Sequence, residues 1–245
     1  MHWADDDLQS VDGAKLIPLA RWDLESNYVA GVSPDMRANR FAGFMRDVEM
    51  WDGAVFGVAQ GEGRQMDPQH RLLMAQALTV LSVCHEEATI VHDGQVNVVT
   101  GICHSEYVAY SHRMGTHITP YTSTSGAASV ACGRISYVFG FKGPCASVDS
   151  ACSSSLVSMH LSRQMVARAE RSFGMASGVN TTLQPYTYIL FQVSGMLAPD
   201  GRCKTLDEAG DGYVRAEACG LVMMQPKGNG ILDDQIPQVL VCGSV

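Results

Sequence analysis

The chain has 245 residues, and its 17 basic and 25 acidic side chains give a formal net charge of −8. A domain that binds duplex nucleic acid normally carries a basic stripe that neutralises phosphates, so this acidic composition argues against a nucleic-acid partner. The hydrophobic fraction of 46% supports a buried core and excludes a largely disordered protein.

The sequence carries no membrane or targeting signal. No apolar run reaches the roughly 18 residues that a membrane-spanning helix needs, and the acidic segment 1–7 lacks the basic start of a signal peptide. The 8 cysteines are widely spaced without a CxxC pair. We therefore expect an intracellular protein with free thiols in a reducing compartment, either the cytoplasm or an organelle stroma.

The first 66 residues contain Pro18, Pro34 and several glycines, which predicts irregular structure with short strand or loop pieces at 41–44 and 54–57. Asp67 and Pro68 are typical of a helix N-cap and first helical position, and the apolar face that follows continues to Cys84. Further strands are predicted at 95–101, 173–179, 220–225 and 239–245, and further helices at 126–139 and 153–169.

Strands that alternate with helices in this way predict an α/β layered fold, in which helices cover both faces of a sheet. At this length, and without a low-complexity linker, a single domain over 1–245 is expected. No metal site is expected, because His104, His112 and His117 are spaced so that they do not share one helix face. We also expect no bound cofactor.

Residues 143–156 contain the strongest functional signal. A Gly-Pro pair leads into a short strand, small residues form a tight turn, and a helix begins. Cys152 therefore lies where a strand passes into a helix, and the amides and the positive end of the helix dipole at this position favour a nucleophilic thiolate. The same amides can hold an oxyanion, and the small neighbours Ala151 and Ser153 leave room for a substrate.

The new helix is predicted to turn apolar residues inward, namely Leu156, Val157, Leu161 and Met165. For Cys152 itself the alternative is an ordinary buried cysteine that packs as a small apolar residue. His70 is predicted to cap or pack a helix, and the three histidines between 104 and 117 are predicted to be solvated. His160 lies eight residues beyond Cys152 and should not reach it.

The segment 148–156, Val-Asp-Ser-Ala-Cys-Ser-Ser-Ser-Leu, closely resembles the nucleophile motif of β-ketoacyl synthases, the condensing enzymes of polyketide and fatty-acid synthesis. Modular polyketide ketosynthase domains are the most similar. Other stretches resemble motifs of the same family, namely 66–73, 131–137, 177–180 and 199–215. The resemblance extends from about residue 17 to residue 245.

The resemblance implies a thiolase-like fold of stacked α-β-α-β-α layers, of which this chain is mainly the first βαβαβ half. In the family an apolar strand at the centre of the first sheet precedes the segment equivalent to 16–23, and an acidic segment stands there in this chain. Residues 239–245 resemble the first strand of the second half. The two histidines that the family takes from that half have no matching motif, so we expect a fragment or a protein completed by another chain.

The implied activity is that of a condensing acyltransferase. Cys152 would accept an acyl group from a phosphopantetheine thioester on an acyl carrier protein, and decarboxylative Claisen condensation with a malonyl thioester would follow. A homodimer or larger assembly is expected. The alternative is a catalytically incomplete ketosynthase-like subunit that assembles or holds an acyl carrier. Acyl length, extender unit and the choice between polyketide and fatty-acid product stay open.

The resemblance also implies that residues 114–129 meet the partner subunit and help line the acyl tunnel, which makes Thr122 and Thr124 candidate substrate-binding residues beside Ala151 and Ser153. An ordinary polar surface loop is the alternative. Glu217 is predicted either to accept a hydrogen bond near the site or to pair with an arginine. The three arginines of 163–171 either attract an acidic carrier protein or, as we prefer, complement a helix dipole.

Overall fold

The computed structural model describes residues 12–23, 40–84, 94–168, 173–225 and 238–244. The chain forms two compact units, and each is described by itself. One unit comprises 45–181 and 218–245, and the other comprises 1–44 and 182–217. The path of the chain thus passes twice from the smaller unit to the larger one.

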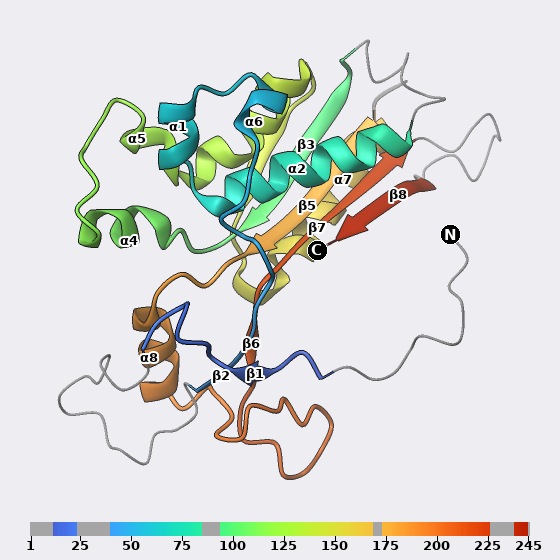
Figure 1. The fold of residues 1–245 in the computed structure, drawn as a ribbon. Coiled ribbons are helices and arrows are strands. Elements are labelled where there is room, and N and C mark those ends of the chain that lie inside the picture. The colour runs from blue at the N-terminus through green and yellow to red at the C-terminus, as the bar shows by residue number, and fades with distance from the viewer. Residues whose placement is uncertain (1–11, 24–39, 85–93, 169–172, 226–237, 245) are drawn as a thin grey trace. The chain divides into compact units, whose positions relative to one another are not determined.

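The larger unit is built on a five-stranded sheet of order β4-β3-β5-β7-β8 (Figure 1). Its strands are β3 (Val96–Ile102), β4 (Cys145–Val148), β5 (Phe173–Asn180), β7 (Ala218–Gln225) and β8 (Gln238–Ser244). The strands β4, β3 and β5 run parallel, whereas β7 is antiparallel to both β5 and β8. The four strands predicted from 95 onward are confirmed.

Helices cover both faces of this sheet, as predicted. The described helices of this unit are α1 (Gln60–Gln65), α2 (Pro68–Val83), α4 (Tyr107–Arg113), α5 (Thr122–Ser125), α6 (Ala128–Phe139) and α7 (Ser154–Arg168), with 3-10 turns η2 (Gly53–Phe56) and η4 (Ala151–Ser153). The helices α2 and α6 pack on one face, and α7 packs on the other against β3 and β5 (Figure 1). Asp67 caps α2 by accepting the Gln69 N–H at 2.8 Å, as the sequence predicts.

Residues 54–57 differ from the prediction of a strand or loop piece, because they lie largely in the 3-10 turn η2. The Asp52 side chain accepts the Ala54 N–H at 3.0 Å and so caps the start of this turn. Gly57 ends it with a φ of 65°, a conformation that glycine adopts at little cost. A local cap therefore decides the structure here.

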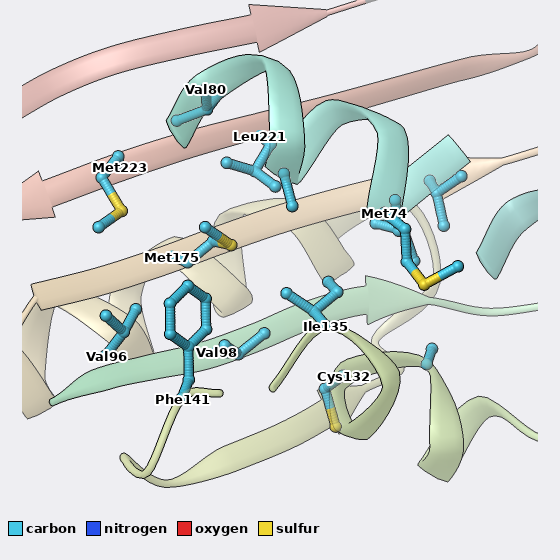
Figure 2. Packing of buried hydrophobic residues seen from close by; sticks show 14 of the residues in the cluster. Met74, Val80, Val96, Val98, Cys132, Ile135, Phe141, Met175, Leu221 and Met223 are labelled. Atoms are coloured by element: carbon cyan, nitrogen blue, oxygen red, sulfur yellow. The ribbon is translucent and has the colours of Figure 1, made fainter. Parts of the chain in front are cut away.

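The core lies between the sheet and the helices α2 and α6. Figure 2 shows side chains that meet there, which come from β3, β5, β7 and both helices, together with Phe141 from the segment between α6 and β4. They include Val98 of β3, Met175 of β5 and Leu221 of β7, all at most 1% exposed. Burying one such side chain stabilises a fold by about 1.5–3 kcal/mol, so this face contributes much of the stability of the unit.

The opposite face corrects the prediction for the helix after Cys152. The buried residues of α7 are Ser154, Ser158, Ser162 and Val166, whereas Leu156 is 68% exposed. The strands beneath explain the error, because a Cβ added to Gly174 would lie 2.4 Å from the Ser162 Oγ. Only small side chains fit at so close an approach. Serine also forms hydrogen bonds there, and the Ser158 Oγ donates to the Ser177 carbonyl at 2.8 Å.

At the centre of the described sheet β3 and β5 pair directly, from Val96 with Phe173 to Ile102 with Val179. The family's apolar strand before residue 16, for which an acidic segment stands in this sequence, has no counterpart between these two strands among the described residues. The segment 1–11 lies outside the described residues. The strand expected to begin a second half, β8, instead joins the edge of the same sheet by pairing with β7.

The smaller unit contains the strands β1 (Lys15–Leu16), β2 (Phe41–Gly43) and β6 (Arg215–Ala216) and the helix α8 (Pro185–Val193). The short strand predicted at 41–44 is thus confirmed. Trp22 packs in its core, where its ring centroid lies 5.8 Å from that of Phe44 and 5.6 Å from that of Tyr188. Within the described parts of both units, no helix is long and apolar enough to cross a membrane.

Candidate active site

Cys152 lies in the turn that joins strand β4 to helix α7. The strand ends at Val148, the 3-10 turn η4 spans Ala151–Ser153, and α7 begins at Ser154. The structure therefore places this cysteine at the start of a helix, as the sequence predicts. Cys152 is exposed, so the alternative of a buried packing cysteine is wrong.

Side-chain hydrogen bonds hold this turn on both sides of the cysteine. Asp149 Oδ1 accepts the Ala151 N–H at 2.9 Å, and Ser154 Oγ accepts the Ser150 N–H at 2.9 Å while it donates to the Ala151 carbonyl at 2.7 Å. Ala151 has a φ of 54°, a left-handed conformation that is uncommon for a residue with a Cβ. These bonds therefore stabilise a turn that local backbone preference disfavours.

The carboxyl ends of β3 and β4 meet beside this turn and contribute residues that the sequence analysis missed. The pKa of the Asp149 carboxyl is lowered, chiefly because it accepts the Ala151 amide and also because the Cys103 thiol donates to it and His104 lies nearby. Their positions in the sequence could have indicated this proximity, since residues that directly follow neighbouring parallel strands lie at the same edge of the sheet. Cys103 and His104 follow β3, and Asp149 follows β4.

The start of α2 holds the loop that follows β3. Asp67 Oδ2 accepts the Ser105 hydroxyl at 2.7 Å, and the Gln69 side-chain amide donates to the His104 carbonyl at 2.7 Å. Asp67 is fully buried, and this burial raises the pKa of its carboxyl. The segment 66–73 therefore fixes the loop that carries Cys103 and His104.

The predicted substrate-binding residues fall into two groups. Ala151 and Ser153 flank Cys152 and are exposed, although the Ser153 hydroxyl donates to the Ser150 carbonyl at 2.8 Å. Thr122 and Thr124 lie in α5. The Thr122 hydroxyl donates to Gln65 Oε1 at 3.0 Å and that of Thr124 to the Tyr121 carbonyl at 3.2 Å. Within the described chain, the hydrogen bonds of these threonines do not lead to the Cys152 turn.

The histidines take the positions that the sequence predicts. His70 packs in the interior with 1% exposure, and burial together with the charge of Arg134 lowers its pKa to about 3. His160 is exposed and bonds Gln164 at 2.8 Å. The histidines at 104, 112 and 117 are also exposed. The described residues contain no cluster of three or more potential metal ligands.

Glu217 belongs to the smaller unit, where it pairs with an arginine. Both its carboxylate oxygens accept hydrogen bonds from Arg21 at 2.9 Å, and one of them also accepts the Thr182 N–H at 2.9 Å. The Glu217 side chain is fully buried, so these partners offset the cost of removing its charge from water. The arginine alternative for this residue is confirmed.

Comparison with known proteins decides the family. Residues 8–229 match the family described as beta-ketoacyl synthase, N-terminal domain. This chain belongs to the β-ketoacyl synthase family. The resemblance of the segment around Cys152 to this family is therefore confirmed.

Related β-ketoacyl synthase sequences occur in large polyketide synthases. The chain is 36% identical over 233 residues to a phenolphthiocerol/phthiocerol polyketide synthase protein of Mycobacterium tuberculosis (strain CDC 1551 / Oshkosh), a match that covers 93% of this chain and 15% of that protein. It is also 36% identical over 206 residues to polyketide synthase GfsA of Streptomyces halstedii, covering 83% of this chain and 3% of that protein. The chain thus spans a small part of these relatives.

Solved ketosynthase structures are similar to the fold. The ketosynthase from module 6 of the bacillaene synthase of Bacillus subtilis 168 has a TM-score of 0.71 and 30% identity, covering 86% of this chain and 34% of that chain. The oxazolomycin ketosynthase domain OzmH KS7 of Streptomyces albus JA3453 has a TM-score of 0.73 and 28% identity, covering 86% and 37% respectively. The predicted thiolase-like α/β fold is therefore confirmed.

Proposed function

We propose that this β-ketoacyl synthase chain acts in polyketide synthesis as a condensing acyltransferase in which Cys152 accepts the acyl group. The observation that carries the proposal is the exposed thiol of Cys152 in the turn that opens α7. A thiol at the start of a helix lies at the positive end of its dipole, which favours the thiolate that attacks a thioester. Ala151 and Ser153 would contact the arriving acyl group.

The acyl transfer is a thiol–thioester exchange. The Cys152 sulfur attacks the thioester carbonyl carbon, and the tetrahedral oxyanion collapses to expel the phosphopantetheine thiolate, which takes up the proton that Cys152 lost. The Cys152 N–H lies in the first turn of a helix, where backbone amides commonly lack an intrahelical acceptor, and we propose that it binds the oxyanion. We propose an acyl carrier protein as the donor, and Thr122 and Thr124 as residues near the acyl path.

Condensation needs further groups, which we propose come from outside the described residues. Decarboxylation of a malonyl thioester requires donors that stabilise an enolate. His70 is buried and neutral at pH 7, and His160 bonds Gln164, so neither is suited to this role. We expect this chain alone to become acylated but to form little or no condensed product from a malonyl thioester. A robust rate of product formation would contradict this part of the proposal.

The test of acyl transfer uses the chain and an acyl thioester of N-acetylcysteamine or of a carrier protein. Intact mass spectrometry and peptide mapping should place one acyl group on Cys152, and Cys152→Ala should abolish it. Cys145→Ala and Cys203→Ala are matched controls, because both thiols are exposed as well. Both control variants should be acylated at the normal rate. Acylation that persists in Cys152→Ala would refute the assigned role.

A further inference from the structure

The turn that presents Cys152 depends on an unusual backbone conformation. Ala151, the residue before the cysteine, has a φ of 54°. A left-handed conformation is unfavourable for alanine, because its Cβ approaches the neighbouring carbonyl oxygen. The conformation persists only if surrounding contacts determine it. The direction of the next side chain, that of Cys152, depends on this conformation.

Two side chains supply these contacts from opposite sides of Ala151. The Asp149 carboxylate accepts the Ala151 N–H at 2.9 Å, and the Ser154 hydroxyl donates to the Ala151 carbonyl at 2.7 Å. Both peptide groups of Ala151 are thereby fixed. Ser154 is itself held, because its Oγ also accepts the Ser150 N–H at 2.9 Å.

Asp149 also connects the turn to the neighbouring strand. The Cys103 thiol, directly after β3, donates to the Asp149 carboxylate, and His104 lies close enough to interact with its charge. The loop that carries these residues is fixed in turn by Gln69, whose side chain donates to the His104 carbonyl. Asp149 therefore links the exposed turn before α7 to the residues that follow the buried strand β3.

We propose that Asp149 is a positioning residue for Cys152, which fixes the sulfur by holding Ala151 in its left-handed conformation. The inference rests on the proposed function of Cys152. Asp149 does not need to contact the acyl group. Because Asp149 is exposed, its removal should disturb the turn without unfolding the protein. A small misplacement of a nucleophile relative to a bound carbonyl costs much more rate than a change in a distant surface turn.

The test compares acylation rates of Asp149 variants with those of a matched turn elsewhere. Asp207 is also exposed, and its Oδ1 accepts the N–H of an alanine two residues on, Ala209, at 2.9 Å. Asp149→Ala should acylate at least about tenfold more slowly than the unmodified chain, whereas Asp207→Ala should stay within about twofold. Alkylation of Cys152 by iodoacetamide should change less than acylation in Asp149→Ala, because a small reagent needs no fixed orientation.

Conservative variants separate positioning from a general structural role. Asp149→Asn keeps a side-chain oxygen at the same place and should restore most of the acylation rate. Asp149→Glu keeps the charge but moves the acceptor, so it should be as slow as Asp149→Ala. If Asp149→Ala does not fold, as urea unfolding would show, the contrast between the Asn and Glu variants gives the same test.

The outcomes also separate this inference from the proposed function. If Cys152→Ala is still acylated, the proposed function fails. If Cys152→Ala is inert while Asp149→Ala matches Asp207→Ala, the function stands and the positioning role is overturned. An Asp149→Asn rate as low as that of Asp149→Ala, with normal urea stability, also overturns the positioning role, because the acceptor oxygen would then not be what matters.

Discussion

Gly101 of β3 lies directly against the backbone of Ser154, so that a Cβ added to Gly101 would be 2.6 Å from the Ser154 carbonyl carbon. The helix that begins beside Cys152 thus rests on the sheet through backbone contact rather than through large side chains. A displacement of α7 at this point would also move the turn that precedes it. The Gly101–Ser154 contact therefore links sheet packing to the position of the proposed nucleophile.

Gly101→Ala should therefore destabilise the fold by about 1–3 kcal/mol, because the added methyl group forces α7 away from β3. Acylation of Cys152 should slow at the same time. Gly133→Ala is the matched control, since Gly133 lies in helix α6 with no atom within 4 Å of an added Cβ. This control should stabilise by up to about 1 kcal/mol through helix propensity. Urea unfolding measures the stability of both variants. Equal stability of the two would contradict the close contact between Gly101 and Ser154.

His70 should make stability fall in weak acid. Its pKa is lowered to about 3 in the folded protein by burial and by the charge of Arg134, whereas an unfolded histidine titrates near 6.5. Between these two values the unfolded chain binds a proton that the folded chain does not. The free energy of unfolding should therefore fall by about 1.4 kcal/mol for each pH unit as pH drops through this window.

His70→Gln should remove this slope, and His160→Gln, which changes an exposed histidine, should retain it. The measurement is urea unfolding at pH 7, 6 and 5 for the unmodified chain and both variants. The difference between each variant and the unmodified chain isolates the changed residue from other titrating groups such as Asp67. A slope that survives unchanged in His70→Gln would contradict the assignment.

The effects of substituting Arg21 and Glu217 on the free energy of unfolding should depend on each other. Arg21→Met removes the guanidinium that donates to both oxygens of the buried Glu217 carboxylate, which should cost about 3 kcal/mol. Adding Glu217→Gln to Arg21→Met should then cost little more, because the buried negative charge is removed as well. A double-mutant cycle by urea unfolding measures the coupling free energy. Additive costs of the two single changes would show that the pair does not act as a unit.

Cys219 should resist alkylation until the protein unfolds. Burial raises the pKa of its thiol to about 12, so both access and thiolate formation are suppressed at pH 8. The exposed Cys145 and Cys203 should react in the native state. Peptide mapping after brief iodoacetamide treatment, with and without urea, measures the difference. Native labelling of Cys219 at the rate of Cys203 would contradict its buried position in β7.

The raised pKa of the Cys219 thiol also predicts that the free energy of unfolding falls at alkaline pH. The folded thiol of Cys219 keeps its proton up to about pH 12, whereas an unfolded thiol begins to lose it near pH 9. Its contribution is complete below pH 9 and is lost as pH rises towards 12, because only the unfolded chain releases the proton. Cys219→Ala should flatten the decline of the free energy of unfolding over this range. If the free energy of unfolding declines just as steeply in Cys219→Ala, other titrating groups cause the decline.

Local patterns determined much of this protein from sequence alone. The helix that begins after Asp67, the strand β3 and the position of Cys152 between a strand and a helix all follow from signals within a few residues. The segment 148–156 also sufficed to indicate the family. Caps, turn residues and short motifs act over one or two turns of chain, so the sequence shows them directly.

Only the tertiary structure decided which groups meet across the sheet. Apolar periodicity predicted Leu156 on the inner face of α7, but the close approach of α7 to the glycines of β3 and β5 leaves room there only for serines and Val166. The direct pairing of β3 with β5 and the contact of Cys103 with Asp149 join segments far apart in the chain. Such contacts depend on the distance between backbones that the complete sheet sets, and no local pattern encodes that distance.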